Sequence, residues 1–198
     1  MSPSGRFVLI AGFTKSVQVR EVAFKKDGIA FEGCKQVMTL SGRDGHSGAV
    51  NGVGVNNDSS FLDAATCSTK DGTFKLWNLD VQHHNDEDPP MLLSVNVPTQ
   101  LLPTMDIIAL SPDSTAVAVC SGQSVAFFEA LPKKGVGGVR PAAAAEKSAA
   151  DRMMGEIIND THKGPIAQAA FSPCGTMLAT CSLQDNAVRV WKVPSRAD

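Results

Sequence analysis

Residue types that could carry out chemistry gather early in this 198-residue chain. The pentapeptide Gly45-His46-Ser47-Gly48-Ala49 loosely follows the G-x-S-x-G pattern of a serine nucleophile, which requires a strand before the serine and a helix after it. Here polar loop residues precede the pentapeptide and an apolar strand pattern follows it. The order of elements therefore argues against a hydrolase, and we predict that the protein is not an enzyme and has no catalytic residue.

Histidine and cysteine could also bind a metal ion. The pair His83-His84 precedes three acidic residues, but this polar stretch ends in two prolines and is typical of a solvated surface loop. Structural zinc sites use closely spaced C-x-x-C pairs, and none occurs among the five cysteines, which are Cys34, Cys67, Cys120, Cys174 and Cys181. We predict no metal site and no cofactor, with reduced thiols in a reducing compartment.

A repeated stretch organises the chain. Residues 65–78 have a close copy at residues 179–192, and each copy reads as a strand, a tight turn and a second strand. Both contain one of the only two tryptophans, with an aspartate six residues before it (77−71 and 191−185). Because the constellation recurs in step with the strands, we interpret it as a structural device rather than an active site.

A second phrase, Ser-Pro followed by a turn and an apolar strand, begins at Ser2, Ser111 and Ser172. Three copies of one phrase favour repeated sheets over a single irregular domain. Apolar runs and alternating patterns predict strands, among them residues 7–11, 17–22, 36–40, 53–55, 91–95, 107–110, 117–120, 124–128 and 166–171. Residues 132–155 interrupt this pattern with an alanine- and glycine-rich insertion that we predict to be partly helical.

The order of these features resembles the WD40 repeat, in which a glycine–histidine pair, strands and an aspartate turn lead to a tryptophan. The resemblance is specific at residues 46–78 and 162–192, moderate at 3–22 and weak at 107–129. It implies an all-β propeller and a hydrogen-bonded structural set in two repeats. The candidates for this set are His46, Thr66, Asp71, Trp77, His162, Thr180, Asp185 and Trp191.

The chain departs from the family pattern at the strand hydroxyl. The pattern places this hydroxyl four residues before the aspartate, where Cys67 and Cys181 stand instead. Thr66 and Thr180 lie five residues before it (71−66 and 185−180), so we predict a one-residue bulge in both turns, with the threonine taking the role.

The length also bears on the architecture. A blade takes ~40–45 residues and closed propellers have typically 4–8 blades, so the chain accounts for about three and a half blades. We place these blades at about 1–40 (partial), 41–97, 105–131 and 156–198. We expect the C-terminal half of a propeller, either a truncated product or an incomplete gene model.

A finer resemblance points to the transducin beta-like group of WD40 proteins. It rests on residues 2–8, 17–22 and 70–77 and covers most of the chain outside the insertion. The resemblance implies a protein-interaction scaffold at the endoplasmic reticulum, with an N-terminal membrane anchor and a stress kinase as partner. No apolar run in these 198 residues approaches the ~20 residues that span a bilayer. The expected location is therefore cytoplasmic by sequence, or the endoplasmic reticulum if a full-length protein carries the anchor.

The net charge bears on whether the chain binds other proteins or nucleic acid. The formal net charge is −2, which removes the simplest electrostatic argument for binding nucleic acid. Arg6, Lys15 and Arg20 could touch RNA beside Phe13, but they are scattered. We expect a scaffold that binds other proteins through its propeller loops, and an RNA-associated module linked to translation control is the alternative.

Overall fold

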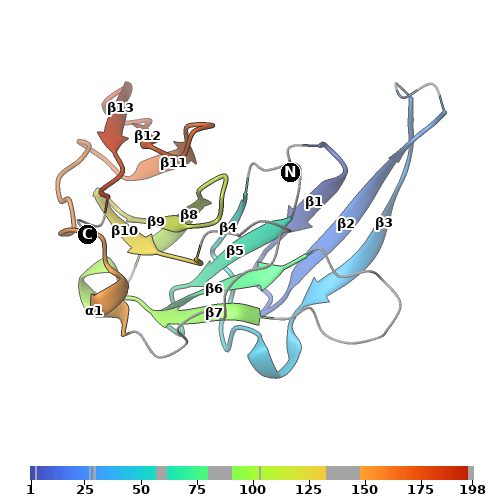
Figure 1. Cartoon of the computed structure of the whole chain (residues 1–198), viewed down its shortest axis with the longest axis horizontal. Coiled ribbons are helices and arrows are strands. Elements are labelled where there is room, and N and C mark those ends of the chain that lie inside the picture. The colour runs from blue at the N-terminus through green and yellow to red at the C-terminus, as the bar shows by residue number, and fades with distance from the viewer. Residues whose placement is uncertain are drawn as a thin grey trace.

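The chain folds into an arc of four antiparallel β-sheets, as a computed structural model shows (Figure 1). The structure describes residues 1–2, 4–26, 28, 30–56, 62–79, 91–102, 104–132 and 148–195. The sheets follow one another in chain order, from the first sheet (β1–β3) to the fourth (β11–β13) at the opposite end of the arc (Figure 1). The prediction of an all-β fold is confirmed.

Among the described residues, the second sheet has four strands and the other three have three each. The strands are β1 (Phe7–Ile10), β2 (Val17–Phe24), β3 (Phe31–Leu40), β4 (Gly52–Val55), β5 (Asp63–Ser68), β6 (Thr73–Asn78), β7 (Met91–Asn96), β8 (Met105–Leu110), β9 (Ala116–Ser121), β10 (Ser124–Glu129), β11 (Ile166–Phe171), β12 (Met177–Ser182) and β13 (Ala187–Lys192). Two 3₁₀ turns (Gly42–Asp44 and Thr99–Leu101) and the helix α1 (Ala149–Arg152) complete the described elements.

The three Ser-Pro phrases form one and the same turn. The backbone N–H of Ser2 donates to the carbonyl of Phe7 over 2.8 Å, and Ser111 and Ser172 make the corresponding bonds over 2.9 Å. In each case the serine hydroxyl also accepts a bond from the backbone five residues later. The turn needs a left-handed residue at its fourth position, where glycine stands twice and Ser114 once, with φ of 59°. The repeated phrase therefore starts a strand in three sheets.

The hydrophobic core lies between successive sheets rather than within one of them. Val17, Val19 and Leu40 of the first sheet pack against Ala64 and Trp77 of the second. Two further clusters join the second sheet to the third and the third to the fourth. Each sheet is thus buried through contact with its neighbours, which is how a repeat architecture gains stability that a single unit lacks.

The predicted insertion is described only from residue 148 onward. There the helix α1 is one turn long, and Ser148 and Asp151 close a capping box at its start. Residues 153–158 then run beside the third sheet, with antiparallel bridges Phe128↔Met153 and Val125↔Ile158. This segment takes the position beside β10 that β7 takes beside β6 in the second sheet.

Candidate functional site

The structure brings His46, Thr66, Asp71 and Trp77 together in one hydrogen-bonded set, called here the first network. Nδ1 of His46 lies 3.0 Å from Oδ2 of Asp71, and Nε2 lies 2.8 Å from the hydroxyl of Thr66. The indole N–H of Trp77 donates to the same hydroxyl over 2.9 Å. His46, Thr66 and Trp77 are all buried. The set links the loop before β4 to both strands of the β5–β6 hairpin.

The donors and acceptors of the first network determine which atom carries each proton. The indole of Trp77 can only donate, so the hydroxyl oxygen of Thr66 accepts that bond. The hydroxyl hydrogen of Thr66 is then available to Nε2 of His46, which must be unprotonated to accept it. Because the ionised carboxylate of Asp71 can only accept, the proton of the neutral imidazole sits on Nδ1 and is donated to Asp71. A histidine held in this way has no nitrogen left for a substrate or a metal.

The second network repeats this arrangement with His162, Thr180, Asp185 and Trp191. Nδ1 of His162 lies 3.1 Å from Oδ2 of Asp185, and Nε2 lies 2.9 Å from the Thr180 hydroxyl. The indole of Trp191 donates to that hydroxyl over 2.9 Å. Trp77 is only 1% exposed because the first sheet covers it, whereas Trp191 is only partly buried.

The networks differ around the aspartate. In the first, the Thr73 hydroxyl donates to Asp71 over 2.8 Å. Ala187 stands at that place in the second network and offers only its backbone N–H, while Arg189 lies 3.5 Å from Asp185. Thr73 was not among the predicted members of the set. A hydroxyl two residues after the turn aspartate was the signal that could have pointed to it.

The pKa values of the first network agree with this proton arrangement. Burial, which outweighs the attraction of the Asp71 carboxylate, lowers the pKa of His46 below its ordinary value. Burial alone would raise the pKa of Asp71, but hydrogen bonds from Thr73, Ser47 and His46 together lower it. A neutral imidazole beside an ionised carboxylate is therefore the stable state near neutral pH.

The bulge predicted in the two turns does not extend into the paired strands. The pairing of β5 with β6 runs without a register shift from Asp63↔Asn78 to Ser68↔Thr73, and the pairing of β12 with β13 is equally regular. Thr66 reaches Trp77 because Trp77 pairs with Ala64, two residues away, which makes the two side chains diagonal neighbours on one face. The spacing of five residues arises from the hairpin loop rather than from an extra residue in a strand.

The third sheet carries a different contact at the corresponding place. Phe128 occupies the position of the tryptophan, and its ring lies 5.3 Å from that of Phe74 at an interplanar angle of 58°. This tilted pair joins the third sheet to the second through apolar contact.

The remaining candidate groups give little chemistry. Within the part of the chain that the structure describes, no group of three or more His, Cys, Asp or Glu side chains could hold a metal ion. The pair His83-His84 lies outside the described residues. Burial raises the pKa of the Cys67 and Cys120 thiols to about 12, so neither is reactive near neutral pH.

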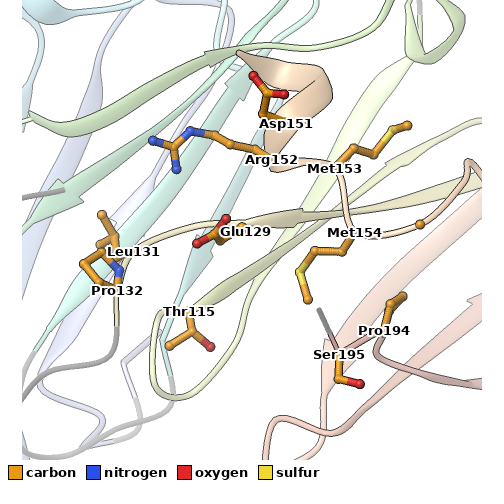
Figure 2. A pocket seen from close by; sticks show the side chains of 11 residues that line it. Thr115, Glu129, Leu131, Pro132, Asp151, Arg152, Met153, Met154, Pro194 and Ser195 are labelled. Carbon is orange, nitrogen blue, oxygen red and sulfur yellow. The ribbon is translucent and has the colours of Figure 1, made fainter. Parts of the chain in front are cut away.

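One cavity of about 440 Å³ opens between the third and fourth sheets. Thr115 and Glu129 line it from the third sheet, and Pro194 and Ser195 from the end of the fourth (Figure 2). The other lining residues are Leu131, Pro132, Asp151, Arg152, Met153, Met154 and Gly155. Its wall is thus mostly apolar, with a few charged groups from α1 and from the end of β10. Sequence reasoning missed this cavity because the segments that form it lie far apart in the chain.

Four stacked antiparallel sheets with a His–Thr–Asp–Trp network in two of them define a WD40 repeat protein of the β-propeller class. The model of the "WD domain, G-beta repeat" family matches residues 34–78 and 156–192, the two regions that hold the networks. Over most of its length the chain is similar to transducin beta-like protein 2. It is 32% identical to the human protein over 191 residues and to the mouse protein over 192 residues.

The chain spans little more than a third of these curated relatives. The alignments cover 96% of the chain but 36% of the human and 37% of the mouse protein. Among solved structures, it resembles the β-propeller domain of Myceliophteria thermophila Cps50 (Swd1), with a TM-score of 0.59 at 11% identity. A chain of the mitotic checkpoint complex gives a TM-score of 0.55 at 17% identity. Each match covers 97% of this chain and about half of the other, at 51% and 49%. The chain therefore has the fold of half a propeller.

Across the described ranges, no helix has the length and apolar character needed to span a bilayer.

Proposed function

We propose that this chain is a non-enzymatic scaffold that binds other proteins, with the cavity between the third and fourth sheets as one of its contact sites. WD40 propellers are typically non-catalytic, and a general role in protein interaction follows from the family. The observation that carries the proposal is that both histidines of the networks have each ring nitrogen engaged by a neighbouring side chain. The groups best suited to chemistry instead tie a loop to a hairpin within the second sheet and within the fourth.

The cavity has the properties of a recognition pocket. Its volume of about 440 Å³ lies within the range typical of ligand sites, and its walls are mostly apolar with a few polar groups. Met153 and Met154 line it, and methionine side chains adapt their shape to different partners. Figure 2 shows Met154 directed toward the space between Thr115 and Ser195. An apolar side chain from a partner's loop or terminus would fit such a space.

The proposed setting is the response to stress in the endoplasmic reticulum, with a stress kinase among the partners. This part of the proposal is supported by the similarity to transducin beta-like protein 2. A cytoplasmic-facing location at that membrane fits a protein with unpaired cysteines. The alternative, RNA binding, is weakened by the ion pair between Arg6 and Glu21 at 2.6 Å, which neutralises one of its candidate contacts.

The test is capture of partners from stressed and unstressed cells, with and without nuclease. Ser195→Trp narrows the mouth of the cavity, and Ser94→Trp adds the same bulk on an exposed position of β7 as a matched control. We expect nuclease-resistant capture that includes an endoplasmic-reticulum kinase, increases with stress and falls only with Ser195→Trp. Loss of all partners after nuclease would favour the RNA alternative. Equal capture by both variants would exclude the cavity as the contact site.

A further inference from the structure

One face of the second, third and fourth sheets is built on the same pattern. We call the face that turns toward the following sheet the forward face and the opposite one the rear face. On the forward faces an alanine pairs across the strands with a large apolar residue, and a cysteine pairs with another. The pairs are Ala65↔Leu76 and Cys67↔Phe74, Ala118↔Phe127 and Cys120↔Val125, and Ala179↔Val190 and Cys181↔Val188.

The forward faces of the second and third sheets are fully covered. Phe74 and Leu76 are 0% exposed because they pack against the third sheet. Val125 and Phe127 of the third sheet are no more than 1% exposed against the fourth. The same positions of the fourth sheet, Val188 and Val190, are 70% and 61% exposed. The last forward face therefore has the composition of an inter-sheet contact without a neighbouring sheet.

The other end of the arc presents a rear face. Leu9, Val17 and Val19 are buried against the second sheet, so the alternate residues of the same strands face outward. The outward pair Val8↔Arg20 stands where Ala64↔Trp77 and Leu178↔Trp191 stand in the second and fourth sheets. Beside it lies Ile10, which is 48% exposed. The first sheet therefore shows the side by which the other sheets pack onto their predecessors.

We propose that the forward face of the fourth sheet binds the rear face of the first sheet in a second copy of this chain. Two such contacts, one at each end, would join two arcs into a ring with twofold symmetry. The arc matches 51% and 49% of two propeller chains along 97% of its own length, so two copies supply about one complete ring. A head-to-tail contact whose rotation closes in this way gives a closed assembly rather than a filament.

The two faces fit each other in size, and the contact centres on an uncharged hollow. A hollow of about 140 Å³ on the fourth sheet is lined by small side chains, Ala170, Ala179 and Cys181 among them, and it takes an aliphatic side chain such as Ile10. The residues lining that hollow are uncharged, so Arg20 of the second copy meets no like charge there. The long stem of an arginine covers apolar surface while its guanidinium reaches the rim.

The test is the mass of the purified chain in solution, measured by size-exclusion chromatography with light scattering. We expect twice the chain mass of 20.8 kDa for the wild type. Val188→Asp and Ile10→Asp should each halve the mass, because each places a carboxylate in both contacts. Phe31→Asp is the matched control, since Phe31 is 63% exposed at the far end of the β2–β3 hairpin, beyond the part of β2 that pairs with β1. Circular dichroism would establish that all three variants fold.

Mixing the two single variants makes the test specific for a head-to-tail contact. The Val188→Asp chain keeps an intact first sheet, and the Ile10→Asp chain keeps an intact fourth sheet, so the mixture can form one good contact. We expect the mixture to form a dimer although neither variant does so alone. The proposal would be overturned if the wild-type chain stays monomeric. It would also be overturned if the two end faces bind only blades of a longer WD40 polypeptide. A dimer that survives Val188→Asp would do the same.

Discussion

Nδ1 of His46 lies 3.0 Å from the carboxylate of Asp71, and this short contact closes a loop onto a hairpin turn. Asp71 also accepts a backbone bond from Ser47, so one carboxylate holds two consecutive residues of the loop. His162 and Asp185 repeat the contact at 3.1 Å in the fourth sheet. The aspartate thus serves as an anchor for the loop that enters the second sheet and for the loop that enters the fourth. We infer that the aspartate stabilises the fold, and the free energy of unfolding measures this contribution.

The hydroxyl of Thr66 should be essential to the stability of the first network. Thr66→Val keeps the size of the side chain but leaves the Trp77 indole and Nε2 of His46 without their bonds. Both groups are buried, so we expect a loss of about 2–4 kcal/mol in the free energy of unfolding. Thr66→Ser keeps the hydroxyl and should cost about 1 kcal/mol. Urea unfolding followed by tryptophan fluorescence measures both, and equal losses would contradict the network.

Stability should fall as the solution becomes acidic. The pKa of His46 in the folded chain lies below its ordinary value of 6.5, so the unfolded chain takes up the proton first. The stability that neutral His46 contributes is fully present above pH 6.5 and is lost as the pH falls below that value toward the lowered pKa of the folded chain. The lowered pKa of Asp71 adds a second loss of stability, which begins as the pH falls below the ordinary value of 3.8.

A substitution can isolate the part of the pH dependence of the unfolding free energy that His46 causes. His46→Gln should be less stable than the wild type at every pH, because glutamine cannot join Asp71 and Thr66 in the same way. In the wild type, the unfolded chain binds one proton more than the folded chain when His46 titrates, and this lowers the free energy of unfolding by at most about 1.4 kcal/mol per pH unit. Between about pH 7.5 and pH 5, the variant should lack this part of the decrease. Parallel curves for the two proteins would show that His46 does not cause the decline.

The thiols should react in a defined order. Cys174 is exposed, and hydrogen bonds with Ser172 and then Thr176 lower the pKa of its thiol to about 7. Iodoacetamide at neutral pH should therefore alkylate Cys174 first, while the buried Cys67 and Cys120 stay protected until the chain unfolds. Peptide mass spectrometry gives the order. Ser172→Ala should slow the reaction at Cys174, and early labelling of Cys67 would contradict the described packing.

Much of the fold could be predicted because its signals are local and repeated. The Ser-Pro turn beginning at Ser2 returns at Ser111 and Ser172, and each copy has the same hydrogen bonds. The two tryptophans and the aspartates before them marked the hairpins on which the networks stand. The candidate histidines and threonines lie within hydrogen-bonding distance of each other in both hairpins.

The parts that escaped prediction depend on contacts between distant segments. Nothing local in residues 153–158 shows that they pair with β10. The reason for Gly54 is also non-local, because a Cβ there would lie 2.9 Å from the carbonyl oxygen of Ile108 in the next sheet. Thr161 replaces the glycine of the repeat pattern, and its N–H donates to the carbonyl of Gln123 in the preceding sheet. Packing between sheets therefore determines which residues stand at these positions, and this packing cannot be deduced from the strand patterns.

Asp71→Ala tests whether the repeated constellation of His, Thr, Asp and Trp is structural. The substitution removes the acceptor for the bonds from His46, Ser47 and Thr73. We predict a loss of about 2 kcal/mol in the free energy of unfolding, with partner capture unchanged at temperatures where the variant is folded. Unfolding and capture would be measured on the same preparation. A variant that melts like the wild type but no longer captures its partners would show that Asp71 acts in binding rather than in stability.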